Sequence, residues 1–217
     1  TDITPREIAQ GGEPAPDIRD NNSENTIGGS KDFDSATLHL QWDLTEDISL
    51  KSITNYLDYV RKARTDLNGT PVQFYANNQF ESSEHYSQEF QLNWDGENHT
   101  TLFGLYYFHE DIDASITIDG PPPYTNVLNR PFLQFEGQQE SDSYAAFWNT
   151  NWSLNEQWSI TTGLRYSKDK KQDVGSRTIP TGVVFPIARK DSWDDWTPTL
   201  GVEYAFSDDL LFYLKAS

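Results

Sequence analysis

Long segments of this sequence alternate apolar and polar residues with a period of two. In the clearest segment the apolar residues occupy every even position, at Ala36, Leu38, Leu40, Trp42 and Leu44. The same parity recurs from Trp158 to Tyr166 and from Trp196 to Phe206, and more weakly from Phe90 to Trp94. Because successive side chains of a β-strand point to opposite faces, each segment predicts a strand with one apolar and one polar face.

Eight strands are expected on this basis, over residues 35–44, 48–61, 84–94, 100–113, 140–154, 158–169, 192–206 and 210–217. Several of them exceed ten residues. Strands of globular proteins usually have about 5–6 residues, whereas a tilted strand that crosses a membrane needs about 9–11. Strand length therefore favours an all-β, antiparallel membrane barrel.

The expected connections alternate between short and long. Short turns at 45–47, 95–99, 155–157 and 207–209 separate long connections at 62–83, 114–139 and 170–191. Short turns at one rim and long loops at the other are typical of outer-membrane barrels, whose long loops face outside. We therefore expect the outer loops 62–83, 114–139 and 170–191 to carry the ligand contacts of this segment.

The chain divides into two unequal parts. Residues 1–33 are rich in Pro, Gly, Asn and Asp and show no period, so we expect an irregular outer loop there. Residues 34–217 contain all the alternating segments and are expected to form a β-barrel segment. No apolar run approaches the roughly 18–20 residues that a membrane-spanning helix requires.

The composition excludes further classes of protein. The 217 residues include 16 Lys+Arg against 34 Asp+Glu, a net charge of −18, whereas nucleic-acid binding requires a basic surface. Aromatic residues make up 14% of the chain, which argues against disorder and suits the aromatic girdles of a barrel. The chain has no cysteine, so disulfides and thiolate metal sites are excluded.

The sequence predicts neither an enzyme nor a cofactor. Its four histidines, His39, His85, His99 and His109, have no zinc-like spacing, and no nucleophile elbow, P-loop or dinucleotide motif is present. The segment His109–Asp113 offers nitrogen and oxygen donors, but its spacing is not that of a calcium loop. We interpret it as a solvated strand end rather than a metal site. Similarly, we interpret the acidic residues Glu110, Asp111, Asp113 and Asp119 as charges on the outer loops.

Basic and indole side chains mark the expected membrane boundaries. The runs Arg61–Arg64 and Lys168–Lys171 come where strands leave the membrane. We interpret both runs as solvated, with contact to anionic lipopolysaccharide as the alternative. Indoles suit the water–lipid boundary, so girdle positions are expected for Trp42, Trp94, Trp152, Trp158, Trp193 and Trp196. A sugar-binding platform is the alternative, and ligand contact is most plausible for Trp193.

Several strand-and-turn phrases resemble the barrels of TonB-dependent receptors, particularly those of sphingomonads and related proteobacteria. These phrases lie at residues 42–56, 87–92, 104–108, 143–147, 161–166 and 195–201. The resemblance covers roughly residues 34–217 and implies a bacterial outer-membrane barrel of about 22 strands. About eight of these strands, as four hairpins, would be present here. The plug domain and the remaining strands are not visible, so we expect the chain to be a fragment of the barrel.

The resemblance also implies a function and partners. A receptor of this family takes up a scarce nutrient such as a ferric siderophore, a cobalamin or an oligosaccharide. Its expected partners are outer-membrane lipid and lipopolysaccharide, a small-molecule ligand, and the TonB complex, which would act through the missing plug region. Two alternatives remain open: a complete small eight-stranded outer-membrane barrel, and a soluble acidic β-sandwich that acts as a binding module.

Overall fold

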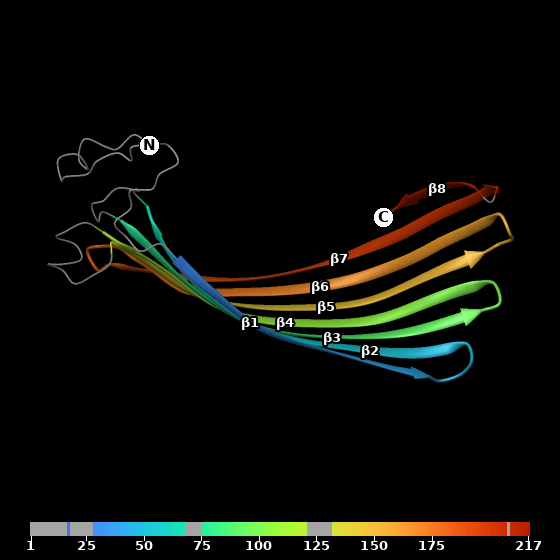
Figure 1. The fold of residues 1–217 in the computed structure, drawn as a ribbon, viewed down its shortest axis with the longest axis horizontal. Coiled ribbons are helices and arrows are strands. Elements are labelled where there is room, and N and C mark those ends of the chain that lie inside the picture. The colour runs from blue at the N-terminus through green and yellow to red at the C-terminus, as the bar shows by residue number, and fades with distance from the viewer. Residues whose placement is uncertain (1–16, 18–27, 68–74, 121–131, 208) are drawn as a thin grey trace.

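A computed structural model describes residue 17 and residues 28–67, 75–120, 132–207 and 209–217. These residues form eight β-strands, drawn in Figure 1: β1 (Gly28–Asp43), β2 (Ile48–Asp66), β3 (Ala76–Gly96), β4 (His99–Asp119), β5 (Leu133–Ser153), β6 (Trp158–Thr178), β7 (Val184–Ser207) and β8 (Leu210–Ala216). Within this part of the chain, no helix is long and apolar enough to cross a membrane. Most of the irregular loop expected at 1–33 lies outside the described residues.

The eight strands form one curved antiparallel sheet in sequence order. In the order of the described strands, β1 neighbours only β2 and β8 neighbours only β7, so the sheet is open. The all-β, antiparallel architecture expected from the alternation is confirmed, and the open sheet is the shape of part of a larger barrel. A soluble sandwich would need two packed sheets, and the described residues form one.

The strands extend further outward than the alternation predicts. Their ends at the short turns lie within two residues of the expected positions, but β3 begins at Ala76 rather than at residue 84. The expected loops 62–83, 114–139 and 170–191 were therefore wrong in extent, and the connections shrink to 67–75, 120–132 and 179–183. The expected loop at 1–33 likewise ends earlier, since β1 begins at Gly28. Strand pairing uses backbone groups, so it continues where side chains on both faces are polar and no apolar period remains.

The connection between β6 and β7 is a tight turn rather than a long loop. Gly182 has a φ of 83°, which side-chain-bearing residues rarely adopt. The N–H of Gly182 donates a 2.8 Å hydrogen bond to the carbonyl oxygen of Ile179. The N–H of Ile179 in turn donates a 3.1 Å hydrogen bond to the carbonyl oxygen of Val183. A type I turn followed by a left-handed glycine is a common three-residue hairpin loop. Lysines and acids of the expected loop 170–191 therefore lie on two paired strands.

The strand register sorts the side chains onto two faces. Leu40, Ser52, Phe90, Leu105, Ala146, Tyr166 and Trp196 lie opposite one another in seven successive strands. Directly opposed residues share a face. We call this the outward face, because the residues near them on it are mostly apolar: Leu38, Leu50, Leu92, Phe103, Trp148, Ile160, Leu164, Pro198, Leu200 and Val202.

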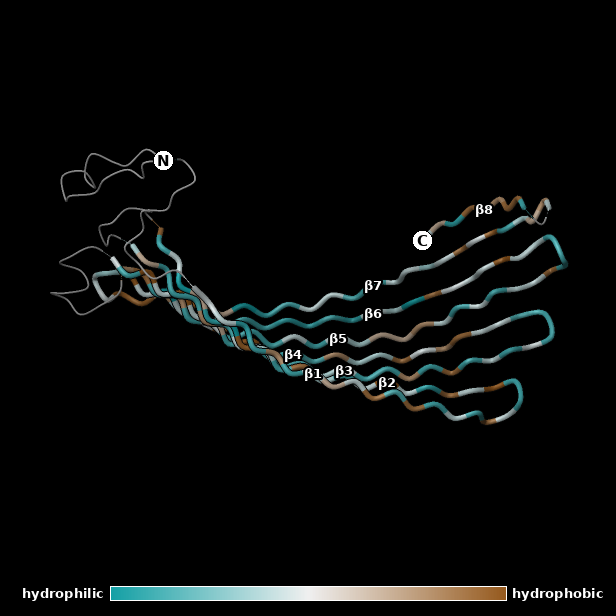
Figure 2. The backbone as a smooth tube through the Cα atoms, viewed as in Figure 1, coloured by the Kyte–Doolittle hydropathy of each residue, from teal (hydrophilic) through white to brown (hydrophobic). Residues whose placement is uncertain are grey.

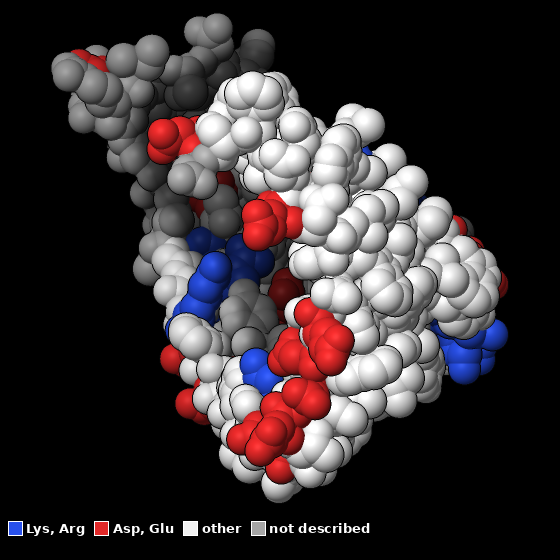
Figure 3. Space-filling model, turned by 90° about the vertical axis from the view of Figure 1, so that its right-hand side faces the viewer, with Lys and Arg blue, Asp and Glu red and all other residues white. Residues whose placement is uncertain are grey.

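The opposite face is polar over the same stretch, and we call it the lumen face. It carries Lys51, Asn55, Glu89, Gln91, Asn149 and Arg165. Figure 2 shows this alternation of hydrophilic and hydrophobic residues along the strands. Seen end-on in Figure 3, the molecule is a trough whose hollow contains Lys and Arg side chains. An apolar outside with a polar inside is the arrangement of a barrel in lipid.

Two rows of mostly aromatic side chains bound the apolar band of the outward face. The inner row, beside the short turns, contains Trp42, Trp94, Trp152, Trp158 and Tyr204, and the outer row contains Tyr56, Tyr86, Tyr107, Tyr144, Tyr166 and Trp196. In β3 the two rows enclose nine residues, from Tyr86 to Trp94, and the same count holds in β5, β6 and β7. A tilted strand needs about 9–11 residues to cross a membrane, so the rows match its two boundaries.

A charge in the middle of the apolar band tests the assignment of the faces. Replacing Phe90 with Arg should destabilise the intact protein in lipid by about 2–4 kcal/mol, because the guanidinium would face the bilayer midway between the aromatic rows. Replacing the next residue, Gln91, with Arg puts the same charge on the lumen face and should change stability by no more than about 0.5 kcal/mol. Denaturant unfolding in lipid vesicles, followed by tryptophan fluorescence, measures both. Equal costs would contradict the assignment.

Candidate functional site

Beyond the outer aromatic row the strands continue into water as a wall with two faces. We call this the outer wall, formed by residues 28–35, 57–66, 76–85, 108–119, 133–143, 167–178 and 184–195. It contains most of the described residues of the segments expected to bind ligand. Its lumen face lines the entrance of the trough, and its outward face stands at the level of the lipid headgroups and above.

Strand parity divides the charged runs noted in the sequence. Lys168 and Lys170 lie on the outward face, whereas Asp169 and Lys171 lie on the lumen face. The run Arg61–Arg64 is divided in the same way, with Lys62 and Arg64 outward. Asp111, Asp113 and Asp119 are outward and Glu110 faces the lumen. Neighbours in sequence therefore do not form the single clusters that the sequence suggested.

Strand parity also divides the tryptophans between the outward face and the lumen face. Trp42, Trp94, Trp152, Trp158 and Trp196 lie on the outward face in the two aromatic rows, as expected for girdle residues. Trp193 is three residues beyond Trp196 and lies on the lumen face, opposite Asp169, with 48% of its surface exposed. Its expected place in a girdle was wrong, because an odd offset along a strand reverses the face. The lumen position keeps ligand contact open for Trp193.

The four histidines occupy separate environments. His39 and His85 lie on the lumen face, where the His85 ring is 5.5 Å from that of Phe108. His99 lies in the inner aromatic row, with its ring centroid 4.6 Å from Trp94 and 5.2 Å from Trp152. His109 lies on the outward face of the outer wall, just beyond the row of tyrosines. The structure therefore brings no two of them together.

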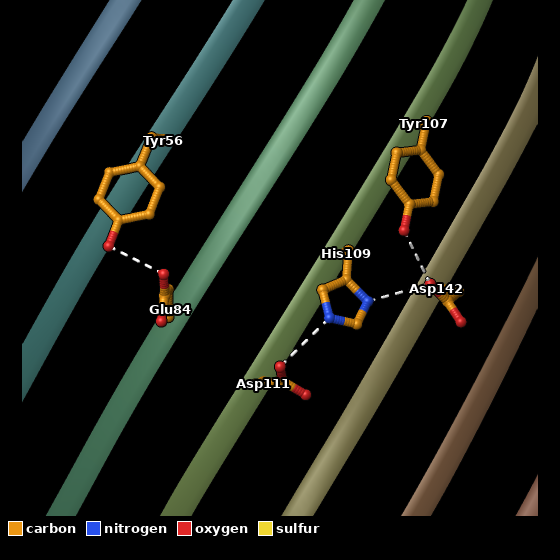
Figure 4. Close-up of polar contacts among 6 residues, drawn as sticks. All are labelled: Tyr56, Glu84, Tyr107, His109, Asp111 and Asp142. Carbon is orange, nitrogen blue, oxygen red and sulfur yellow. Dashed lines mark hydrogen bonds and ion pairs between the residues drawn. The ribbon is translucent and has the colours of Figure 1, made fainter.

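His109 is held between two carboxylates, as Figure 4 shows. Its Nδ1 is 3.0 Å from Asp142 Oδ1, and its Nε2 is 3.2 Å from Asp111 Oδ2. The hydroxyl of Tyr107 donates a 3.2 Å hydrogen bond to the same Asp142 oxygen. Since carboxylates only accept hydrogen bonds, both ring nitrogens donate when the ring is protonated. Hydrogen bonding to Asp142 raises the pKa of His109, Asp111 adds to this, and partial burial opposes it.

The same residues could in principle hold a metal. His109, Glu140 and Asp142 each offer a ligand atom, and these atoms lie within 4.8 Å of one another. A metal would require a neutral imidazole with one free ring nitrogen, whereas both nitrogens of His109 face carboxylates. The geometry therefore favours an ion-pair clamp between β4 and β5 over a metal centre. Asp142 lies 33 residues from His109, so only the strand register reveals this partner.

A second polar network ties three strands together near the outer end of the wall. Arg64 Nη1 donates a 2.6 Å hydrogen bond to Asn78 Oδ1 and lies 3.5 Å from Asp119 Oδ2. The amide of Asn78 also donates to Asp119, at 3.0 Å. These contacts hold β2, β3 and β4 in register well beyond the apolar band. A firm wall at this height can present side chains to a ligand from fixed positions.

A family model for the β-barrel of TonB-dependent receptor-like proteins matches residues 3–217. The chain belongs to the TonB-dependent receptor family. Barrels of this family lie in the outer membrane of Gram-negative bacteria, and the family consists of transporters rather than enzymes. No curated protein matches the sequence.

Solved structures share this fold. The ferric yersiniabactin uptake receptor of Yersinia pestis aligns over 87% of this chain and 28% of its own, with a TM-score of 0.75 and 21% identity. The ferric-catecholate import receptor of E. coli K12, in its closed form, aligns over 90% and 33%, with a TM-score of 0.67 and 12% identity. The siderophore receptor of Acinetobacter baumannii aligns over 84% and 31%, with a TM-score of 0.60 and 14% identity. The chain thus spans about a third of the length of these receptors.

The clamp at His109 predicts a pH dependence. Its pKa lies above the ordinary value of 6.5, so its contribution to stability is fully present below pH 6.5 and is lost as the pH rises through the folded-state pKa. Replacing His109 with Gln should lower the melting temperature of the intact receptor more at pH 5.5 than at pH 8.5, by an amount that reflects at most about 1 kcal/mol. The NMR titration of His109 should shift downward more in Asp142→Asn than in Asp111→Asn. A larger effect at the higher pH would refute the clamp.

Proposed function

We propose that this chain forms part of the wall of an outer-membrane receptor that takes up a scarce nutrient, with a ferric siderophore as the ligand class. The match of the family model to nearly the whole chain supports uptake by a TonB-dependent mechanism. The similar structures are receptors for ferric yersiniabactin, ferric catecholates and siderophores, which supports the ligand class. Cobalamins and oligosaccharides are the competing ligands that an experiment must separate.

The two faces would have different roles in such a receptor. The apolar outward band holds the wall in the bilayer, while the polar lumen face, with Glu89, Gln91 and Arg165, provides a hydrated path. Coupling to the TonB complex would run through a plug domain packed against this lumen face. The outer wall would take the first ligand contacts, because it stands above the membrane on the side of the longer connections.

Ligand contacts fall on alternate residues of the segments 62–83, 114–139 and 170–191. Because much of each segment is strand, only every second side chain faces the lumen, among them Phe135, Gln139, Asp173 and Arg177. Trp193 lies on the same face just beyond the third segment. The proposed binding surface is thus one face of a wall rather than three whole loops.

Uptake of a radiolabelled ferric siderophore by cells carrying the intact receptor tests the proposal. Shortening the three outer segments to tight hairpins should lower uptake by about tenfold or more, because truncation removes specific contacts while the barrel remains. Replacing the short turn at Glu97 and Asn98 with another two-residue turn is the matched control and should leave uptake unchanged. Uptake that persists after all three segments are shortened would contradict the proposal. Uptake of cobalamin or an oligosaccharide in place of iron would change the ligand class.

We also propose that the outward face of the outer wall contacts lipopolysaccharide. Lys168, Lys170 and Lys190 all lie on this face, two, four and six residues beyond the outer aromatic row. The Nζ of Lys170 is 5.5 Å from the ring centroid of Tyr144, so this charge stands directly at the membrane boundary. A lysine near an anionic lipid surface contributes about 1 kcal/mol of attraction. Lys168 and Lys170 are therefore placed to meet phosphates of the outer leaflet, although Asp194 lies opposite Lys168 and Asp142 lies opposite Lys170.

Replacing Lys168, Lys170 and Lys190 with Gln tests this contact. The loss of three positive charges should reduce the affinity of the purified receptor for lipopolysaccharide by about tenfold or more, and the difference should shrink at high salt. The control replaces Lys171 and Arg189, which face the lumen, with Gln in the same way. Lipopolysaccharide retained by the purified receptor provides the measurement. An equal loss in the control would show that general charge, rather than this surface, is responsible.

A further inference from the structure

Arg165 lies on the lumen face of β6, next to Tyr166 of the outer aromatic row. The strand register places it in one row with lumen residues of the six strands before and after it: Gln41, Lys51, Gln91, Gly104, Phe147 and Thr197. This row contains two cations and no acid. A ligand that passes from the outer wall into the membrane-spanning part of the lumen would meet Arg165 at the boundary between them.

Phe147, which lies opposite Arg165 in β5, is packed against the backbone of β4. Its partner there is Gly104, and a Cβ on Gly104 would clash with the Phe147 ring. The ring therefore occupies the space that a side chain at residue 104 would take, and this close approach requires glycine. The position of the ring is thus fixed by the neighbouring strand.

The guanidinium of Arg165 is held by this ring and by one hydrogen bond. Its Cζ lies 5.6 Å from the centroid of the Phe147 ring, within the range of a cation–π contact. Its Nε donates a 2.9 Å hydrogen bond to Ser167 Oγ, two residues further along the same strand. Because both contacts restrict the planar group before any partner arrives, binding a partner costs less conformational entropy. The guanidinium is therefore preorganised.

The two Nη atoms of this guanidinium have no protein partner in the described strands. The hydrogen bond to Ser167 uses the N–H of Nε, and no other hydrogen bond or ion pair of Arg165 occurs within the part of the chain that the structure describes. The nearest acid in the pairing pattern is Asp195, diagonally across in β7. The guanidinium instead lies over Phe147 in β5, on the side away from Asp195. Its positive charge is thus left unpaired toward the lumen.

We propose that the Nη atoms of Arg165 bind a carboxylate of the incoming ligand, which narrows the ligand class to ferric chelates that carry a free carboxylate. The inference rests on the proposed function, because it names a contact that the ligand makes as it enters the lumen. Two parallel N–H···O bonds from a guanidinium match the two oxygens of a carboxylate. Hydrocarbon surrounds the wall at this height, so the charge of Arg165 is screened less than it would be at an open surface.

Modification of arginines by phenylglyoxal, measured residue by residue with mass spectrometry, tests this contact in the intact receptor. Malonate at millimolar concentration should slow the modification of Arg165 by several-fold, because a bound carboxylate covers the reactive Nη atoms. Malonamide, an uncharged molecule with the same carbon skeleton, should not slow it. Arg61 and Arg189 are controls in the same sample, since both lie on the lumen face and neither guanidinium lies over a ring among the described residues.

Phe147→Leu tests the contribution of the ring separately from that of the charge. This variant keeps Arg165 but removes the aromatic surface beneath it, so protection of Arg165 by malonate should fall by several-fold. Phe108→Leu is the matched control and should leave protection unchanged. Phe108 also lies on the lumen face, but its ring lies beside that of His85, with 5.5 Å between the ring centroids.

Three outcomes would overturn the contact. Malonate could have no effect on Arg165, or it could protect Arg61 and Arg189 equally, which would indicate general screening of charge. Arg165 could also be unreactive without malonate while the two control arginines react, which would show that another part of the receptor already covers its Nη atoms.

Ferric siderophore uptake by the same variants separates the two proposals. Arg165→Gln should lower uptake by several-fold, whereas Lys51→Gln, which removes the same charge from the same row, should have a smaller effect. Uptake by a receptor whose Arg165 malonate does not protect overturns only the contact. Protection with the expected variant pattern, in a receptor that supports no uptake, overturns only the proposed function.

Discussion

The ladder of backbone hydrogen bonds between neighbouring strands determines where every side chain of this sheet lies. Pairing is continuous through the first six strand pairs, and within the described strands the one irregularity lies between Ala205 and Ser207 in β7. Because the side-chain period is two, a slip of one residue would move a whole strand's apolar set to the other face. Leu40 and Trp196, at opposite sides of the sheet, share the outward face only because each intervening register is kept.

The surroundings of the strands change at the outer aromatic row, and the side chains change with them. Between the rows the outward face meets lipid, which offers no hydrogen bonds, so the positions there are mostly apolar. Beyond the row both faces meet water. The outward face there carries charged side chains, some of them in ion pairs such as that of His109 with Asp142. An ion pair of this kind in the apolar band would carry a large desolvation penalty. The same strands therefore serve as a membrane anchor below and as a hydrated wall above.

Above the membrane the two faces of the wall carry different side chains. The outward face combines the outer aromatic row with lysines, and acids lie opposite two of them, at Asp142 and Asp194. The lumen face has a gap at Gly137 and Gly175, where the sheet is only one backbone thick. Side chains cover most of the sheet surface, so two paired residues without side chains leave a hollow in it.

Alternation, turn chemistry and strand length were enough to predict the membrane-crossing part of each strand, because a lipid-facing strand must be apolar at every second residue. They located the inner strand ends and the indoles beside the short turns. They failed beyond the outer aromatic row, where water on both faces removes the apolar period, so 170–191 was expected to be a loop although it forms two strands and a tight turn. The pairing of His109 with Asp142 and the pairing of Gly137 with Gly175 depend on the register between distant segments. Only the assembled sheet fixes that register, because the register depends on backbone pairing between strands and not on the sequence pattern within any one strand.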